Sequence, residues 1–121
     1  MKFKLLLFIL SKKLKKAAKS NLAFKKFIEG KRVKVVMKTA NGGQGRAYVV
    51  QNGKIGSSTR DFSNADAAFV WSDGNTAFEV LSSGDDEAII AAMTEKTLQS
   101  EGNFKEFIWF LTALGKMEQK T

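Results

Sequence analysis

Apolar and basic residues recur at helical spacing near the start of the chain. At 100° per residue, one set of apolar positions shares a side of a helix, and a set of lysines shares the opposite side. The apolar positions are Leu7, Leu10, Leu14, Ala17, Ala18 and Leu22, and the lysines are Lys12, Lys13, Lys15, Lys16 and Lys19. The pattern predicts a basic amphipathic helix over about residues 3–19.

A second, shorter helix is expected directly after the first. Ser20 and Asn21 are typical N-cap residues, and Gly30 is a typical stop signal. The apolar positions between them are Phe24, Phe27 and Ile28. Two arrangements are open for both helices: their apolar sides pack on the rest of the chain, or they contact a membrane directly.

After these helices the period of the pattern changes to two. Val33, Val35 and Met37 share one face of an alternating strand. A glycine-rich turn over 40–45 then leads to a second strand over 46–51.

A tight hairpin follows the second strand. Asn52-Gly53 is a strong hairpin signal because both positions tolerate positive φ. The turn is expected to set Val50 beside Ile55 and Tyr48 beside Ser57. The third strand, over 54–60, is rich in small polar residues and is expected at a sheet edge, and the segment 66–71 predicts a buried fourth strand.

The second half of the chain returns mainly to helical patterns. A short helix with Phe78, Val80 and Leu81 is broken at 82–84, and the acidic residues at 85–87 suit the N-terminus of the next helix. The apolar edge of that helix is Ile89, Ile90 and Met93.

A short strand and a long helix complete the pattern. The strand is expected over 97–101, and Gly102-Asn103 opens the helix. Its apolar positions are Phe104, Phe107, Ile108, Phe110, Leu111 and Leu114. Trp109 lies on the opposite, polar side, where it is either covered by another element or exposed for a reason.

This order of elements predicts an α+β fold, in which a five-stranded sheet carries helices packed on one face and is preceded by a basic amphipathic N-terminal helix. The length of 121 residues allows one core. We expect a basic helical arm over residues 1–30 and a globular body over 31–121.

Charge separates these two parts. The chain has a net charge of +8, all of which comes from residues 1–30, where nine lysines face one acid, Glu29. Since the lysines are interleaved with large apolar residues, the pattern favours an anionic lipid surface over nucleic acid as a partner. Arginine, which reads bases bidentately, is missing from residues 1–30, so no specific nucleic-acid partner is expected.

The composition disfavours catalysis. The chain has no histidine and no cysteine, so the usual metal ligands, the commonest general base and the thiol nucleophile are missing. The carboxylates Asp61, Asp66 and Asp73 are expected in turns or at strand ends, and the glycines over 42–45 lack the lysine of a phosphate-binding loop. We expect no enzyme activity, no metal and no cofactor.

The apolar run over residues 5–10 resembles part of a secretion signal but is shorter than the usual roughly 7–15 residues. It is also far shorter than the roughly 20 residues of a membrane-spanning helix. We therefore expect a cytoplasmic chain that is at most peripheral at a membrane.

The succession of elements over residues 66–114 resembles the sterol carrier protein type-two family, the SCP-like lipid-binding domain. In that family a strand ending in a polar bend leads to a small helix, a glycine-containing break, a helix, a short strand, a Gly-Asp pair and a terminal helix. Here the break is 82–84, and the pair is Gly102-Asn103, so an amide replaces the customary acid. With the upstream hairpin, the likeness covers about residues 31–114.

The resemblance implies an apolar tunnel between the sheet and the helices that receives an acyl chain, a sterol or an isoprenoid. The candidate lipid-binding residues are Phe78, Leu81, Ile89, Ile90, Met93, Phe104, Phe107, Ile108 and Leu111. The candidate membrane-docking residues are Lys12, Lys13, Lys15, Lys16, Lys19 and Trp109. The same apolar residues are also compatible with an ordinary filled core.

Two functions therefore remain open. In the first, the chain binds or transfers a lipid or fatty acid and docks reversibly on anionic membranes through its N-terminal helices. In the second, it is a ligand-free scaffold or accessory module that binds a protein partner in a lipid or isoprenoid biosynthetic pathway. An uncovered apolar arm would also allow a homodimer.

Overall fold

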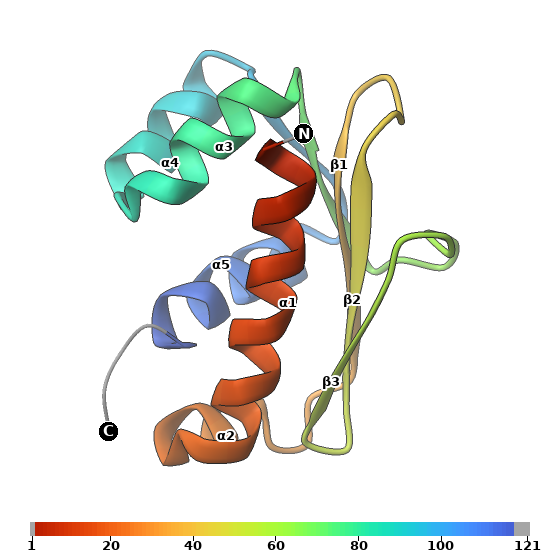
Figure 1. Ribbon diagram of the computed structural model, residues 1–121, viewed down its shortest axis with the longest axis vertical. Helices are drawn as coiled ribbons and strands as arrows, with labels where there is room; N and C mark the ends of the chain where they lie inside the picture. Colours follow the sequence, from red (N-terminus) through yellow and green to blue (C-terminus); the bar gives the residue numbers. More distant parts are fainter. Residues whose placement is uncertain (1, 118–121) are drawn as a thin grey trace.

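The chain folds into two layers, a five-stranded sheet and a layer of helices on one of its faces (Figure 1). The computed structural model describes residues 2–117. The helices are α1 (Lys2–Ser20), α2 (Leu22–Ile28), α3 (Gly74–Ser83), α4 (Asp86–Thr94) and α5 (Phe104–Met117). The strands are β1 (Val33–Thr39), β2 (Gly45–Gln51), β3 (Lys54–Ser58), β4 (Ala67–Trp71) and β5 (Leu98–Gly102).

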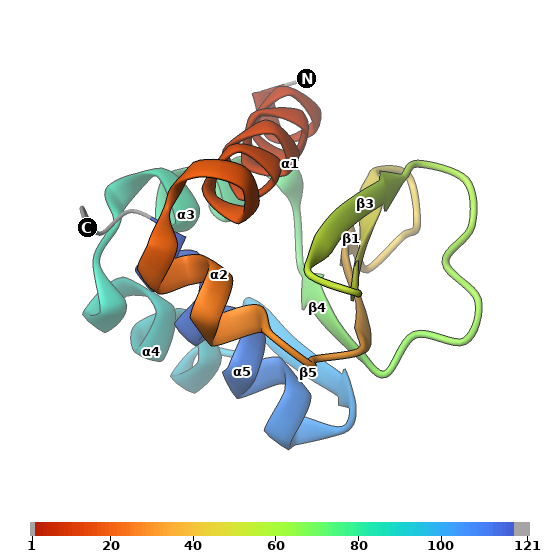
Figure 2. The same cartoon turned by 90° about the horizontal axis from the view of Figure 1, so that it is seen from below.

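The sheet is mixed, with the strand order β3-β2-β1-β4-β5. β1 pairs with β4 in parallel, while the β1–β2, β2–β3 and β4–β5 pairs are antiparallel. The predicted α+β class is confirmed, as is the position of β3 at an edge. The connection from β3 to β4 crosses the face of the sheet that the helices leave open (Figure 2), and Phe62 in that connection packs near Val36, Ala47 and Ala68.

The predicted hairpin turn is confirmed in its register. Asn52 and Gly53 have φ angles of 54° and 72°, as the expected turn requires. The paired residues across it are Val50 with Ile55 and Tyr48 with Ser57.

Side chains cap the helices at the positions that the sequence indicates. Asn21 Oδ1 accepts a hydrogen bond from the Phe24 amide at 3.1 Å, and Asp85 Oδ1 accepts one from the Glu87 amide at 2.9 Å. Asn103 Oδ1 likewise accepts from the Lys105 amide at 2.9 Å. The side-chain oxygen of Asn103 therefore supplies the hydrogen-bond acceptor that a helix N-terminus needs, as an aspartate would.

Helix α1 packs on the sheet and completes the core. Phe3, Leu7 and Leu14 are each only 1% exposed. The hydroxyl of Tyr48, on β2, donates a hydrogen bond to the Leu7 carbonyl oxygen at 2.7 Å. Burial raises the pKa of Tyr48, so this hydroxyl stays protonated and remains a donor.

Of the two arrangements left open for the basic helices, the structure shows the one in which their apolar sides pack on the rest of the chain. Phe24 and Ile28 of α2 are fully buried, and they join the same hydrophobic cluster as the inner side of α1. Residues of α1 and α2 thus share one core with the sheet and with α5.

Candidate lipid site

Aromatic rings fill the space between the sheet and α5. The ring of Phe107 stacks on that of Phe69, with the ring centroids 4.1 Å apart. The ring centroid of Phe110 lies 5.9 Å from that of Phe69 and 5.4 Å from that of Tyr48. Phe107 and Phe69 are 0% exposed. Phe107, a candidate lipid-binding residue, therefore belongs to the packed core.

An apolar groove lies between α4 and α5. Its volume is about 380 Å³, and its lining residues are Asp86, Ile89, Ile90, Ile108, Leu111, Thr112, Gly115 and Lys116. Four of the nine candidate lipid-binding residues meet here, two from each helix: Ile89, Ile90, Ile108 and Leu111. Ile90 is 63% exposed and Ile108 is 42% exposed, so the groove opens at the surface.

Besides Phe107, four candidates do not line this groove: Phe78, Leu81, Met93 and Phe104. Leu81 and Met93 are half-buried and pack against the core. Phe78 is half-buried on α3, and the Nζ of Lys2 lies 5.5 Å from the centre of its ring. Phe104 is 52% exposed at the start of α5.

Apolar side chains make up most of the groove lining, which also includes the charged residues Asp86 and Lys116. Asp86 lies in the first turn of α4, and Lys116 lies in the last turn of α5. Such a surface can hold a hydrocarbon chain against the isoleucines while a polar end remains near solvent. The sequence pattern anticipated the apolar residues but gave no signal for Asp86, Thr112 or Lys116.

Trp109 is covered by α2. Its ring stacks on that of Phe27 with centroids 5.2 Å apart and planes 8° from parallel. The Nζ of Lys31 lies 5.0 Å from the centre of the Trp109 ring and 2.6 Å from Glu106 Oε1. This candidate docking residue therefore contributes to the contact between α2 and α5.

The candidate docking lysines lie along α1. Lys12, Lys13, Lys16 and Lys19 are exposed, and Lys15 is half-buried.

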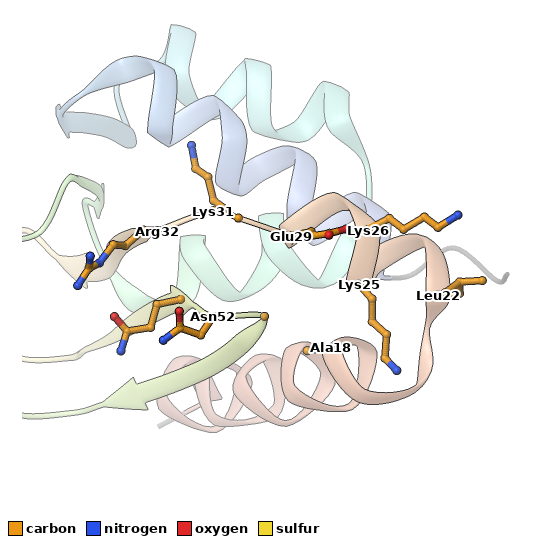
Figure 3. Close-up of a pocket in the computed structure, with 11 residues that line it drawn as sticks. Ala18, Leu22, Lys25, Lys26, Glu29, Lys31, Arg32 and Asn52 are labelled. Atoms are coloured by element: carbon orange, nitrogen blue, oxygen red, sulfur yellow. The ribbon is translucent and has the colours of Figure 1, made fainter.

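A larger basic depression lies where α1, α2 and the β2–β3 turn approach one another (Figure 3). Its volume is about 720 Å³. Its basic side chains diverge: Lys25 points toward α1, Lys31 points toward α5, and Lys26 and Arg32 point outward in different directions (Figure 3). They do not surround a common point where an anion could bind.

Asp61 and Asp73, two of the carboxylates considered for catalysis, accept hydrogen bonds from nearby backbone amides and hydroxyl groups. Hydrogen bonds from Ser63 hold the pKa of Asp61 below its usual value, and hydrogen bonds from Thr76 do the same for Asp73, the N-cap of α3. Within residues 2–117, no group of three or more histidine, cysteine or acidic side chains could hold a metal ion. No helix in that range is long and apolar enough to span a bilayer.

Neither a protein-family model nor a curated protein matches the sequence. Solved structures do match the fold. A UbiJ-SCP2 ubiquinone synthesis protein aligns with a TM-score of 0.65 at 12% identity, over 91% of this chain and 90% of its own. Sterol carrier protein 2 from Yarrowia lipolytica, in its apo form, aligns with a TM-score of 0.52 at 15% identity, over 79% and 86%.

A third similar structure is TT1886 from Thermus thermophilus, with a TM-score of 0.56 at 17% identity, over 90% of this chain and 83% of its own. The sec-alkylsulfatase Pisa1 from Pseudomonas sp. also aligns, with a TM-score of 0.57 at 13% identity over 80% of this chain, but the match spans only 14% of the sulfatase. It therefore concerns one part of that enzyme and indicates no enzyme activity here. The chain adopts the SCP2-like fold, which the resemblance predicted for about residues 31–114.

Proposed function

We propose that this chain is a non-enzymatic binding or transfer protein for an apolar lipid of the fatty acyl, sterol-like or isoprenoid class. The observation that carries the proposal is the groove between α4 and α5. Its volume of about 380 Å³ lies within the roughly 300–1,000 Å³ typical of ligand pockets. A hydrocarbon chain seated on its isoleucines gains ~0.8 kcal/mol for each CH₂ that leaves water.

The fold supports this proposal. Two of the similar structures are named as SCP2 proteins, and one of these is also named for ubiquinone synthesis. The latter name supports an isoprenoid among the possible ligand classes. We place the ligand in the α4–α5 groove, at the surface, because aromatic rings fill the neighbouring interior.

The proposal includes reversible docking on anionic membranes through the lysines of α1. Lys12, Lys16 and Lys19 are exposed on α1, whose sequence contains no acidic residue. Near an anionic surface each lysine can contribute ~1 kcal/mol before screening by salt. Several of them together support attachment that raised salt reverses.

A ligand-free accessory role is the second candidate, and the filled aromatic interior favours it. In that case the groove between α4 and α5 receives a protein partner of a lipid or isoprenoid biosynthetic pathway, or a second copy of this chain. The apolar walls of the groove suit a helix laid into it.

Titration with a fluorescent long-chain fatty acid separates the two candidates. Ile90→Asp and Ile108→Asp each place a charge in the groove at an exposed position, so the fold should persist. Leu22→Asp is the matched control, because Leu22 is 60% exposed and Ile90 is 63% exposed. We expect saturable binding by the natural chain and by Leu22→Asp, and binding about tenfold weaker or worse by the groove variants.

Native mass spectrometry of the gently purified chain provides an independent readout. Co-purified lipid that disappears in Ile108→Asp supports the first function. No bound lipid, together with no binding of the probe, contradicts lipid binding and leaves the accessory role.

A further inference from the structure

Large apolar side chains lie on the solvent side of α1 as well as on its buried side. Leu5 is 60% exposed, Phe8 is 44% exposed and Ile9 is 39% exposed. All three lie in the first half of the helix. A contiguous set of exposed apolar residues on a folded chain indicates an interaction surface.

Lysines continue this outer face toward the end of α1. At 100° per residue, Lys12, Lys16 and Lys19 lie on the same side of the helix as Leu5. After the exposed Lys2 and Lys4 at its start, the outer face is therefore apolar over residues 5–9 and cationic over residues 12–19.

Phe8 lies near the point where these two parts meet. Two basic side chains lie near its ring, one from α1 and one from β2. The Nζ of Lys12 is 5.3 Å from the ring centre, and the guanidinium carbon of Arg46, on β2, is 5.5 Å from it. Arg46 is held in place by a hydrogen bond from its Nη1 to Ser57 Oγ at 2.9 Å. Helices that bind at a membrane interface also combine aromatic and other apolar residues with lysine and arginine.

The outer face is available while the inner face of α1 stays on the sheet. Phe3, Leu7 and Leu14 are buried beneath the helix, and the Tyr48 hydroxyl is bonded to the Leu7 carbonyl oxygen. Release of α1 would return these side chains to water. Docking therefore does not require the helix to leave the body.

We propose that the outer face of α1 inserts into anionic membranes, with Leu5, Phe8 and Ile9 in the acyl boundary. Lys12, Lys16 and Lys19 then lie among the anionic headgroups, and the whole folded chain rests on α1. This inference rests on the membrane docking in the proposed function and adds the inserting residues and the orientation. We infer a lipid bilayer as the partner of this face because an anionic bilayer offers an apolar acyl region next to negatively charged headgroups. Nucleic acid would leave Leu5 and Ile9 in water.

Vesicle co-sedimentation of the full chain tests this surface. The vesicles are phosphatidylcholine alone or phosphatidylcholine mixed with phosphatidylglycerol, at low and raised salt. The double variant Leu5→Ser/Ile9→Ser is compared with Leu22→Ser, because Leu5 and Leu22 are both 60% exposed. We expect the double variant to bind the mixed vesicles about tenfold more weakly or worse, and Leu22→Ser to bind like the natural chain.

A site-specific label gives a second readout that does not depend on affinity. The chain has no cysteine, so Ile9→Cys accepts an environment-sensitive dye at one position. We expect a blue shift on mixed vesicles for this label and none for a label at Ser100→Cys, on the exposed strand β5.

The outcomes distinguish this inference from the function on which it rests. If Lys12→Gln/Lys16→Gln abolishes binding while Leu5→Ser/Ile9→Ser and the Ile9 label show no change, docking is purely electrostatic and the insertion surface is wrong. Equal loss for Leu22→Ser would also overturn the placement on α1. If the natural chain does not bind mixed vesicles, or binds neutral vesicles equally well, the proposed anionic docking fails and the insertion surface fails with it.

Discussion

At the scale of single residues, Gly102 is the position that tolerates a side chain least. Its φ angle is +79°, and a Cβ there would lie 2.6 Å from the carbonyl oxygen of Asp66, the residue before strand β4. That same oxygen accepts a hydrogen bond from the Asn103 amide at 2.8 Å, so it cannot move away freely. The glycine before the last helix is therefore required by packing.

We predict that Gly102→Ala lowers the free energy of unfolding by about 1–3 kcal/mol. Urea denaturation measures the change. Gly115→Ala is the control, because no atom lies within 4 Å of its added Cβ and alanine favours a helix. Similar stability for the two variants would contradict the packing argument.

A second residue-scale prediction concerns Tyr48. Tyr48→Phe removes the hydrogen bond to the Leu7 carbonyl oxygen but keeps the buried ring. It should lower the free energy of unfolding by about 0.5–1.5 kcal/mol, as for other buried hydrogen bonds. Thermal denaturation at neutral pH would reveal this, and an unchanged midpoint would show that α1 is held by apolar packing alone.

At the scale of elements, α3 depends on an ionised cap. The amide and hydroxyl of Thr76 donate to the Asp73 carboxylate, and they hold its pKa below the usual 3.8. The depressed pKa adds stability above the unfolded value, and this stability is lost as the pH falls through the folded value. Asp73→Ala should therefore lower the melting temperature near neutral pH, and the difference from the natural chain should shrink below pH 3.8.

Asp73→Asn is the control for that titration, since asparagine keeps the acceptor without the charge. Its melting temperature should lie between those of the natural chain and Asp73→Ala at neutral pH, and residue 73 should then contribute no pH dependence. A difference between Asp73→Ala and the natural chain that stays constant into acid would argue against the carboxylate as the cap.

The elements themselves were predictable because their signals are local. The Asn52-Gly53 turn, the Asn21 and Asp85 caps and the change of period after α2 each depend on neighbouring residues. Contacts between elements that are distant in the sequence were not predictable. Trp109 lies on the polar side of α5, and only the fold places Phe27 of α2 against it.

The candidate site shows the same limit. Periodicity identified Phe107 and Ile108 as apolar positions of one helix, but it cannot say that Phe107 stacks on Phe69 in the core while Ile108 faces a groove. The first half of α1 is apolar on nearly every side, so its sequence did not reveal that Leu5 and Ile9 would remain exposed.

At the scale of the whole molecule, the two proposed surfaces lie apart. Figure 2 shows α1 along one side of the helical layer, with α4 and α5 on the side away from it. A chain resting on α1 would therefore leave the α4–α5 groove open to a ligand or a protein partner. This arrangement suits presentation of a lipid at a membrane surface.

Isoleucine-methyl NMR tests the central claim, lipid binding in the α4–α5 groove, most directly. The chain has six isoleucines: Ile89, Ile90 and Ile108 line the groove, Ile28 and Ile55 are buried, and Ile9 lies on the outer face of α1. On titration with a fatty acid below its critical micelle concentration, we predict saturable shifts of the three groove methyl signals and none for Ile28 or Ile55. Unmoved groove signals, or shifts confined to Ile28 and Ile55, would contradict the account.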